Sequence, residues 1–270
     1  MESHFIQVFV CFYLDLIQGD EMSGISWLNL GNGDVTCDPD SEVLPFQFQL
    51  SSAPHILTRL PESIGYLTTL SNFDVSFNKL THLPESIGAL HNLSRFDAHN
   101  NQLICLPESI GSLASLTHLR LYNNELTQLP DSIGCLKSLI HFDVSHNQLH
   151  CLPESIGSLI SLTVLDIGNN RLTHLPDSIG RLPSPTLLDK FINLFTHIPD
   201  SIRGLTSLTH LNVVNNQLIY LPDSIGNLSS LTYLNVNNNP ITSAEEGKAD
   251  VAKRFGRIGL RLIVNDFPFY

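Results

Sequence analysis

Histidine, aspartate and cysteine are the residues of this chain most capable of chemistry, and many of them recur 23 positions apart. His118 and His141 are separated by one such interval, and Asp143 lies two residues further on. These three side chains could in principle ligate a metal ion, but no tight ligand motif accompanies them. The sequence also lacks the short motifs of phosphate-binding loops, zinc hydrolases and serine hydrolases. We therefore expect a protein that is not an enzyme and that needs no metal or other cofactor.

The five cysteines do not suggest a disulfide framework. Cys105 and Cys151 are two intervals apart, which in stacked strands corresponds to roughly 10 Å, whereas a disulfide needs Cα atoms within about 7 Å. Unpaired cysteines are typical of a reducing compartment, so we expect a cytoplasmic protein. No apolar run approaches the roughly 20 residues that span a bilayer, so no transmembrane segment is expected. With 26 acids against 14 bases and a net charge of -12, nucleic acid is disfavoured as a partner.

The 23-residue interval reflects an internal repeat that fills residues 60–243 without an insertion. The shared frame is LPxSIGxLxxLxxLxLxxNxLxx, and its alternating apolar residues predict one short strand per unit with one buried face. The Leu-Pro-Glu/Asp-Ser segment predicts a short helical turn, because proline suits the first helical position and the acid complements the helix N-terminus. A single unit cannot bury its own leucines, so the units must stack as coils. We number these coils 1 to 8, starting at Leu60, Leu83, Leu106, Leu129, Leu152, Leu175, Ile198 and Leu221.

This frame resembles the leucine-rich repeat family, in particular the 23-residue repeats of intracellular Ras-binding scaffolds, Ras-suppressor-like proteins and Scribble-like proteins. The resemblance implies an α/β solenoid, a curved horseshoe with a concave parallel β-sheet and short convex helical turns. It also implies a protein-binding scaffold, with small GTPases or phosphatases as a class of partner. Secreted members of the family usually carry cysteine-bearing caps, and the sequence has no such caps beside its repeats, which again favours a cytoplasmic setting.

The ends of the repeat array are less regular than its centre. Residues 22–59 contain two degenerate repeats, of which the second matches the frame at its opening, residues 39–41, and at its close, residues 55–59. We therefore expect ten coils. A solenoid needs polar caps over its exposed ends, so we assign residues 1–21 to an N-terminal cap and residues 244–270 to a C-terminal cap of one helix and one strand, the strand at residues 260–264.

Asparagine occupies one position in all eight regular coils. An amide both donates and accepts hydrogen bonds, so a column of asparagines can satisfy the backbone groups of the turn that follows each strand. A ligand-binding role is the alternative for this column, but buried polar groups need partners in every coil, which favours the structural role. The column consists of Asn78, Asn101, Asn124, Asn147, Asn170, Asn193, Asn216 and Asn239.

Polar, charged and aromatic residues occupy the outward positions in and beside the predicted strands. Aspartate is depleted in strands, and like charges on adjacent strands repel, so packing does not demand the aspartates. Alternatively, solvent screens the repulsion and short polar side chains suit a curved sheet. Arginine, histidine and aromatic residues are common interface anchors, and histidine protonation could also alter binding near neutral pH. The candidate partner-binding residues are Asp74, Arg95, Asp97, His99, His118, Arg120, Tyr122, His141, Asp143, Asp166, Asp189, Phe191, His210, Asn212, Tyr233 and Asn235.

Coil 6 departs from the frame. Pro185 replaces a core leucine, Lys190 takes an inward strand position, and Phe191, Ile192 and Leu194 replace small or polar residues. One hypothesis is a local bulge that turns Phe191 inward and lets Lys190 reach water, and the cost of burying an unpaired ammonium favours it. The other hypothesis is an exposed apolar docking spot.

Together these features predict a non-catalytic scaffold that binds a protein partner with a basic surface on its concave face, in intracellular signalling. The alternative is a recognition module of a larger receptor, kinase or secreted host-targeted effector. Reversing two charges, Asp143→Lys with Asp166→Lys, is expected to abolish capture of the partner while leaving thermal stability nearly unchanged.

Overall fold

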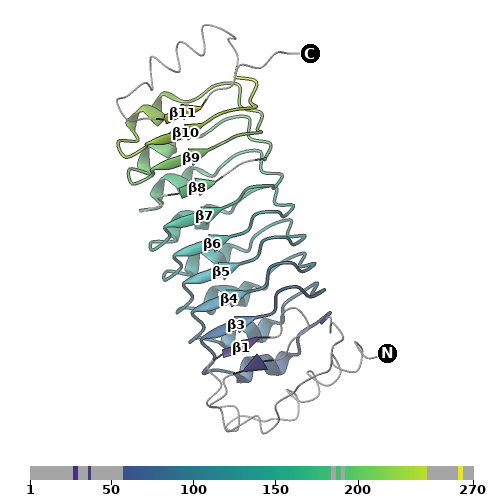
Figure 1. Ribbon diagram of the computed structural model, residues 1–270. Helices are drawn as coiled ribbons and strands as arrows, with labels where there is room; N and C mark the ends of the chain where they lie inside the picture. The colour runs from purple at the N-terminus through teal and green to yellow at the C-terminus, as the bar shows by residue number, and fades with distance from the viewer. Residues whose placement is uncertain are drawn as a thin grey trace.

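The computed structural model describes residues 27–29, 36–37, 57–183, 187–189, 192–241 and 261–263, the short segments 27–29, 36–37, 187–189 and 261–263 by their backbone alone. Its coils stack one above another into an elongated array in which the strands form one continuous sheet (Figure 1). The sheet order of the described strands is β11-β10-β9-β8-β7-β6-β5-β4-β3-β1-β2. The fold is therefore the expected α/β solenoid with a concave parallel sheet.

Each regular coil contributes one three-residue strand, and every pair of neighbours from β3 to β10 is parallel. The register advances by one repeat per strand, so that Phe73 pairs with Phe96 and Asp143 with Asp166. Residues of one type at one repeat position therefore lie in vertical columns. The strands are β3 Asn72–Asp74, β4 Arg95–Asp97, β5 His118–Arg120, β6 His141–Asp143, β7 Val164–Asp166, β8 Leu187–Asp189, β9 His210–Asn212 and β10 Tyr233–Asn235.

The described strands at the two ends of the array differ in how well the sequence predicts them. β11 (Arg261–Ile263) is parallel to β10 and lies within the strand expected at residues 260–264. At the other end, β1 (Trp27–Asn29) bonds directly to β3, and β2 (Thr36–Cys37) runs antiparallel to β1. The second degenerate repeat therefore places no strand between β1 and β3, where the expected ten-coil arrangement requires one. The N-terminal cap at residues 1–21 and the helix of the C-terminal cap lie outside the described residues.

A five-residue 3-10 helix follows the Leu-Pro pair of each regular coil, or the Ile198-Pro199 pair in coil 7. In coil 1, Pro61 is extended, with φ −76° and ψ 158°, and its carbonyl accepts a hydrogen bond from Ile64 N at 3.2 Å. Such i to i+3 bonds suit short turns of this length. The helices are η3 Glu62–Tyr66, η4 Glu85–Ala89, η5 Glu108–Ser112, η6 Asp131–Cys135, η7 Glu154–Ser158, η8 Asp177–Arg181, η9 Asp200–Gly204 and η10 Asp223–Asn227.

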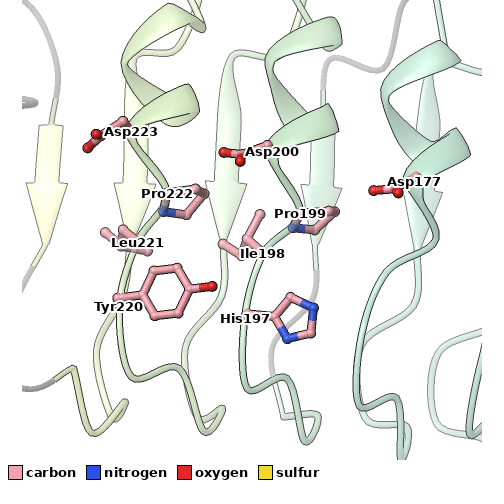
Figure 2. A pocket seen from close by; sticks show the side chains of 9 residues that line it. All are labelled: Asp177, His197, Ile198, Pro199, Asp200, Tyr220, Leu221, Pro222 and Asp223. Carbon is pink, nitrogen blue, oxygen red and sulfur yellow. The ribbon is translucent and has the colours of Figure 1, made fainter.

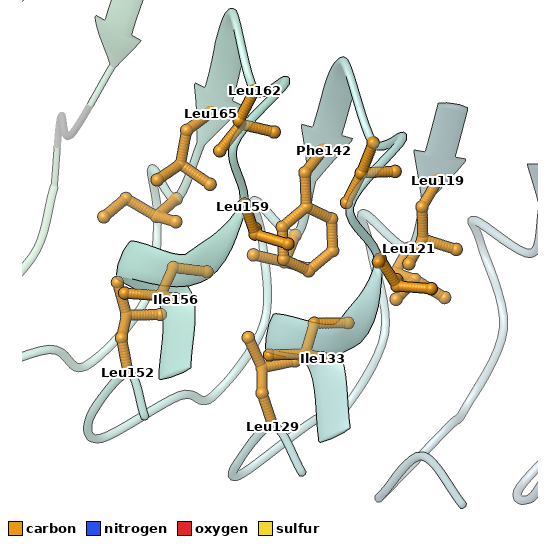
Figure 3. Close-up of a cluster of buried hydrophobic side chains, with 14 of the residues drawn as sticks. Leu119, Leu121, Leu129, Ile133, Phe142, Leu152, Ile156, Leu159, Leu162 and Leu165 are labelled. Carbon is orange, nitrogen blue, oxygen red and sulfur yellow. The ribbon is translucent and has the colours of Figure 1, made fainter. Parts of the chain in front are cut away.

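The hydrophobic core lies between the sheet and the 3-10 helices. Figure 3 shows Phe142 and Leu165, the middle residues of two neighbouring strands, facing Ile133 and Ile156 of the helices. All four side chains are fully buried. Because each fully buried Leu, Ile or Phe contributes about 1.5–3 kcal/mol, this repeated core is the main source of stability.

Glycine and serine set the distance between neighbouring 3-10 helices. A Cβ atom added to Gly134 would lie 2.4 Å from the carbonyl oxygen of Ser155 and 2.6 Å from its Cβ. The same close approach recurs between Gly111 and Ser132 and between Gly157 and Ser178. The Ser-Ile-Gly segment of the frame is thus explained by contact between coils, which the sequence alone did not reveal.

Coil 6 keeps the regular register on both sides of its irregular segment. β8 pairs with both neighbours, and beyond it Ile192 N donates to Val214 O at 3.0 Å and Leu194 N to Leu172 O at 2.9 Å. Ile192 and Leu194 are 45% and 40% exposed, which meets one requirement of the docking hypothesis. Pro185, Lys190 and Phe191 lie outside the described residues, so the bulge that would turn Phe191 inward stays a prediction.

Candidate functional site

The eight asparagines of the column form a hydrogen-bonded ladder behind the carboxyl ends of the strands, and all except the half-buried Asn239 are buried. In coil 4, Asn147 Oδ1 accepts from Leu126 N at 3.0 Å, and its Nδ2 donates to Leu121 O, Val144 O and Ser145 O at 3.0, 3.0 and 3.1 Å. Leu121 and Leu126 belong to the preceding coil, so each amide ties two coils together. Equivalent bonds from the preceding coil reach Asn78, Asn101, Asn124, Asn170, Asn193, Asn216 and Asn239.

The structure brings most candidate partner-binding residues together on the concave face. The first strand positions align Arg95, His118 and His141, and further along the sheet His210 and Tyr233. The third positions align Asp74, Asp97, Arg120, Asp143, Asp166, Asp189, Asn212 and Asn235. For Asp189 only the strand backbone is described, and Phe191 lies outside the described residues.

The strand-end carboxylates also serve the loops that follow them. Asp143 Oδ1 accepts from Ser145 N at 3.0 Å and from Ser145 Oγ at 2.7 Å, and Asp166 Oδ1 accepts from Gly168 N at 2.9 Å. These are local bonds of the kind that aspartate and asparagine make two residues ahead in turns. Lysine at either position would remove the acceptor. The structure thus adds a loss of local hydrogen bonds to the effect of Asp143→Lys with Asp166→Lys, and the small change in stability expected for this variant stays a prediction.

A neutral acceptor makes the same bond in the last two coils. Asn212 Oδ1 accepts from Val214 N at 3.3 Å, and Asn235 Oδ1 accepts from Asn237 N at 3.2 Å. In coil 3 the position is Arg120, whose guanidinium lies 3.5 Å from Asp97 Oδ1 of the preceding coil. The side chain of Asp97 is 12% exposed, and that of Arg120 is 36% exposed.

Three groups of rings line the concave face. His99 and Tyr122 stack with ring centroids 4.3 Å apart, and Phe77 meets the edge of His99 at 5.1 Å. His118 and His141 stack at 5.9 Å, and His210 and Tyr233 lie 5.6 Å apart. The solenoid thus holds these rings in fixed places before any partner arrives.

The environment of these rings shifts several pKa values. Burial lowers the pKa of His99 below its usual value, although the nearby Asp97 and Asp74 oppose this shift. Burial also lowers the pKa of His118, with help from Arg95 and Arg120. The pKa of His141 is lowered by burial and then by Arg120. The three imidazoles therefore favour the neutral form.

Metal binding finds little geometric support on this face. His118 and His141 stack face to face with an interplanar angle of 18°, whereas a metal ion is bound in the plane of each ring, at its nitrogens. Within the part of the chain that the structure describes, no three His, Cys, Asp or Glu side chains are close enough to hold a metal ion.

The described helices include none that is long and apolar enough to cross a bilayer.

A shallow groove of about 770 Å³ lies away from the sheet, where three coils enter their 3-10 helices (Figure 2). His197 and Tyr220 lie at its lower side, and Asp177, Asp200 and Asp223 lie one per coil above them. The sequence did not predict this groove as a site. Its acids start the 3-10 helices, which already accounts for their presence.

Backbone strain marks a column that the sequence prediction missed. The residue before each ladder asparagine has a positive φ between 50° and 57°. Asparagine tolerates this left-handed conformation and fills the position in most coils, which is the signal that could have revealed it. Ile192, by contrast, is a β-branched residue in this conformation, with φ 50°.

Comparisons with known proteins agree with this geometry. A family model described as "Leucine-rich repeat region" matches residues 107–192, and one described as "Leucine Rich Repeat" matches residues 207–228. A search of curated protein sequences found no match.

Solved structures that resemble the chain include the ectodomain of a plant membrane receptor kinase and a plant peptide hormone receptor. The receptor kinase GASSHO1/SCHENGEN3 from Arabidopsis thaliana, in complex with CASPARIAN STRIP INTEGRITY FACTOR 2, is 34% identical over 67% of this chain and 23% of its own, with a TM-score of 0.61. The plant peptide hormone receptor RGFR1 with RGF2 is 28% identical over 68% of this chain and 35% of its own, with a TM-score of 0.59. PEPR1 with AtPEP1 is 30% identical over 68% of this chain and 30% of its own, with a TM-score of 0.54.

The chain spans between about a quarter and a third of the length of these receptor chains. The stacked coils, the asparagine ladder and the family matches lead to one assignment. The chain is a leucine-rich repeat protein.

Proposed function

We propose that this chain is a non-catalytic module that binds a protein partner on its concave face. The observation that carries the proposal is the column of strand-end carboxylates held in register beside ordered rings. Because the solenoid fixes these groups in advance, a docking partner loses little additional ordering entropy on this side. The surplus of carboxylates favours a partner with a basic surface.

Charge neutralisation tests this proposal more sharply than charge reversal. Asparagine at positions 143 and 166 keeps the acceptor oxygen for the Ser145 and Gly168 amides and removes only the negative charge. We expect Asp143→Asn with Asp166→Asn to weaken capture of the native partner from cell extract at least about tenfold, in the range of buried interface charges. The thermal midpoint should stay nearly unchanged.

The matched control removes two charges from the other side of the coils. Asp131 and Asp177 are exposed in the first turns of η6 and η8. Asp131→Asn with Asp177→Asn removes the same amount of negative charge and should leave capture intact. If the variant at positions 143 and 166 captured the partner as well as this control does, the binding surface would lie elsewhere.

For the cellular setting, we propose an intracellular signalling scaffold. Cys105, Cys135 and Cys151 are free thiols, which suits a reducing compartment. Basic surfaces of small GTPases or phosphatases are the partners that the family resemblance suggests for a capture panel.

A second candidate is a recognition segment of a larger receptor, favoured by the similarity to the ectodomain of a plant membrane receptor kinase and to a plant peptide hormone receptor. Thiol titration of the protein isolated from its native cells under alkylating conditions separates the two. Five reactive thiols in the denatured chain support the intracellular scaffold, whereas fewer support an oxidising compartment.

A further inference from the structure

The loops that lead from each strand to the next 3-10 helix form one long edge of the solenoid, below the arrowheads of the strands in Figure 2. Most of the exposed large apolar side chains among the described residues lie on this edge. They are Phe77 and Ile104 of coils 1 and 2, and Ile192, Leu194, Ile219 and Tyr220 of the neighbouring coils 6 and 7. The exposed apolar surface of the edge is therefore concentrated in coils 6 and 7.

Ile192, Leu194 and Ile219 form a surface that we call the edge patch. Their side chains are 45%, 40% and 49% exposed. Ile219 N donates to Thr196 O at 3.4 Å, two residues beyond Leu194, so the loop of coil 7 runs beside the loop of coil 6. Exposed apolar side chains that gather on neighbouring loops typically mark an interaction surface.

Ile192 destabilises the fold that carries it. Its φ of 50° places a β-branched residue in the left-handed conformation. In other coils an asparagine at this position connects neighbouring loops, as Asn123 Nδ2 does by donating to Asn100 Oδ1 at 2.9 Å and Asn238 Nδ2 by donating to Asn215 Oδ1. Isoleucine cannot make this bond, and its exposed side chain recovers little free energy by burial. Strain without a structural gain points to a function of the side chain itself.

The loops around the edge patch lack the negative charge that covers the rest of the regular coils. The carboxylates of these coils stand at the strand ends and at the starts of the 3-10 helices, with Glu125 as the exception. Residues 167–176, 192–199 and 213–222 contain no Asp or Glu. Two copies that each carry a net charge of -12 can therefore meet here with little local repulsion. The exposed amide of Gln217 both donates and accepts, so it suits contact with an identical surface.

We propose that the edge patch is the contact surface for a second copy of this chain in a two-fold symmetric dimer. In such a dimer both copies contribute the same surface, so Ile192, Leu194 and Ile219 pack against their counterparts. A patch of this size suits a weak dimer rather than a permanent one. The inference is independent of the proposed function, because the concave sheet takes no part in this contact.

Sedimentation velocity from about 1 µM to about 300 µM, the range in which weak interfaces associate, provides the test. We expect the wild-type chain to shift from monomer to dimer across this range. Ile192→Asn with Leu194→Gln introduces the residue types that coil 7 carries at these positions, Asn215 and Gln217. Because a two-fold interface contains each change twice, self-association should weaken at least about tenfold. The variant is expected to fold, since it removes the strained isoleucine.

Ile140→Thr with Ile160→Thr is the matched control. These isoleucines are 40% and 62% exposed on the opposite edge, between the 3-10 helices and the strands, and other coils carry Thr163 and Thr206 at the equivalent positions. The control also removes two exposed isoleucines, and it should leave the dimer unchanged.

Added salt gives a second readout. It shortens the Debye length from about 10 Å at 0.1 M to about 3 Å at 1 M and so screens the repulsion between two acidic copies. The apolar contact is not screened, so we expect the dimer to become stronger as salt is added.

A chain that stays monomeric throughout, a dimer that survives Ile192→Asn with Leu194→Gln, or a dimer that salt weakens would overturn the proposal. Loss of native partner capture in that variant, with a monomeric wild-type chain, would assign the edge patch to a different protein and also overturn it. Asp143→Asn with Asp166→Asn separates the two surfaces, because it should weaken partner capture and leave the dimer intact. Failure of either proposal therefore leaves the other standing.

Discussion

Gly134→Ala probes the contact that spaces neighbouring 3-10 helices. The new Cβ would lie 2.4 Å from Ser155 O, 2.6 Å from Ser155 Cβ and 2.9 Å from Ser155 C. The sheet and the asparagine ladder fix the coils on both sides, so the clash cannot be relieved by moving one flexible side chain. Overpacking of this kind costs about 1–3 kcal/mol.

An opposing effect must be subtracted from this cost. Gly134 does not have a positive φ, so alanine is compatible with its backbone and reduces the entropy of the unfolded chain, a gain of about 0.4–1 kcal/mol. The steric cost exceeds this gain, and we expect a net loss of about 1–2 kcal/mol. For a domain of this size, that corresponds to a thermal midpoint lower by about 2–8 °C.

Circular dichroism during thermal and urea unfolding measures this loss, and Ser155→Ala provides the matched control. The hydroxyl of Ser155 is buried without a hydrogen-bond partner in the described part of the chain, so its removal should be neutral or slightly stabilising. In the double variant Gly134→Ala with Ser155→Gly, the contact with Cβ disappears but the contact with the carbonyl oxygen remains, and recovery should be partial. Unchanged or increased stability of Gly134→Ala would refute the close-packing argument.

Three other changes test different parts of the structure. Asn147→Ala should cost about 3 kcal/mol or more in urea titrations, because it leaves several buried backbone groups without partners. Alanine at Asn92, an exposed amide that donates to Thr68 O, should cost under about 1 kcal/mol. Ile192→Asn should raise the unfolding free energy by about 1 kcal/mol, because asparagine relieves the strain of the left-handed backbone at this position. Ile219 is similarly exposed but does not have a positive φ, so Ile219→Asn should bring no such gain, and equal effects of the two changes would reject strain as the cause. The pKa of His99 is lower in the folded state, so the unfolded chain binds more protons below about pH 6.5. The free energy of unfolding should therefore decrease as the pH falls below about 6.5, and a pH series of unfolding curves should show a smaller decrease in His99→Gln.

The regular coils could be predicted from the sequence because each structural demand is repeated. The ladder is the clearest case: Asn124 and Asn147 make the same bonds in successive coils, and a buried amide without those bonds would be penalised in each of them. Strand positions followed from the alternation of buried residues such as Phe142 and Val144. A short pattern that would be ambiguous in one coil therefore became a reliable predictor of the fold because it recurs in every regular coil.

Contacts between coils could not be predicted in the same way. The approach of Gly134 to Ser155 depends on a separation of a few ångströms between residues 21 positions apart, and residue types alone do not give it. At the start of the array, residues 38–59 match the frame only at their two ends. The strand that pairs with β1 therefore could not be predicted from these residues, and in the structure it is β3, with Leu28 opposite Phe73.

The strand-end aspartates carry more charge than the fold requires. Asp143 and Asp166 accept loop amides, but Asn212 and Asn235 make the same bond without a charge. Arg120 shows that a coil also forms without any acceptor at this position. The need for an acceptor oxygen therefore explains why a short Asp or Asn side chain stands at this position. It does not explain the negative charge of Asp143 and Asp166, which repel each other across adjacent strands. We propose that recognition of a basic partner accounts for that charge. The asparagine variants at positions 143 and 166 separate the two roles, because they remove the charge and keep the acceptor oxygen.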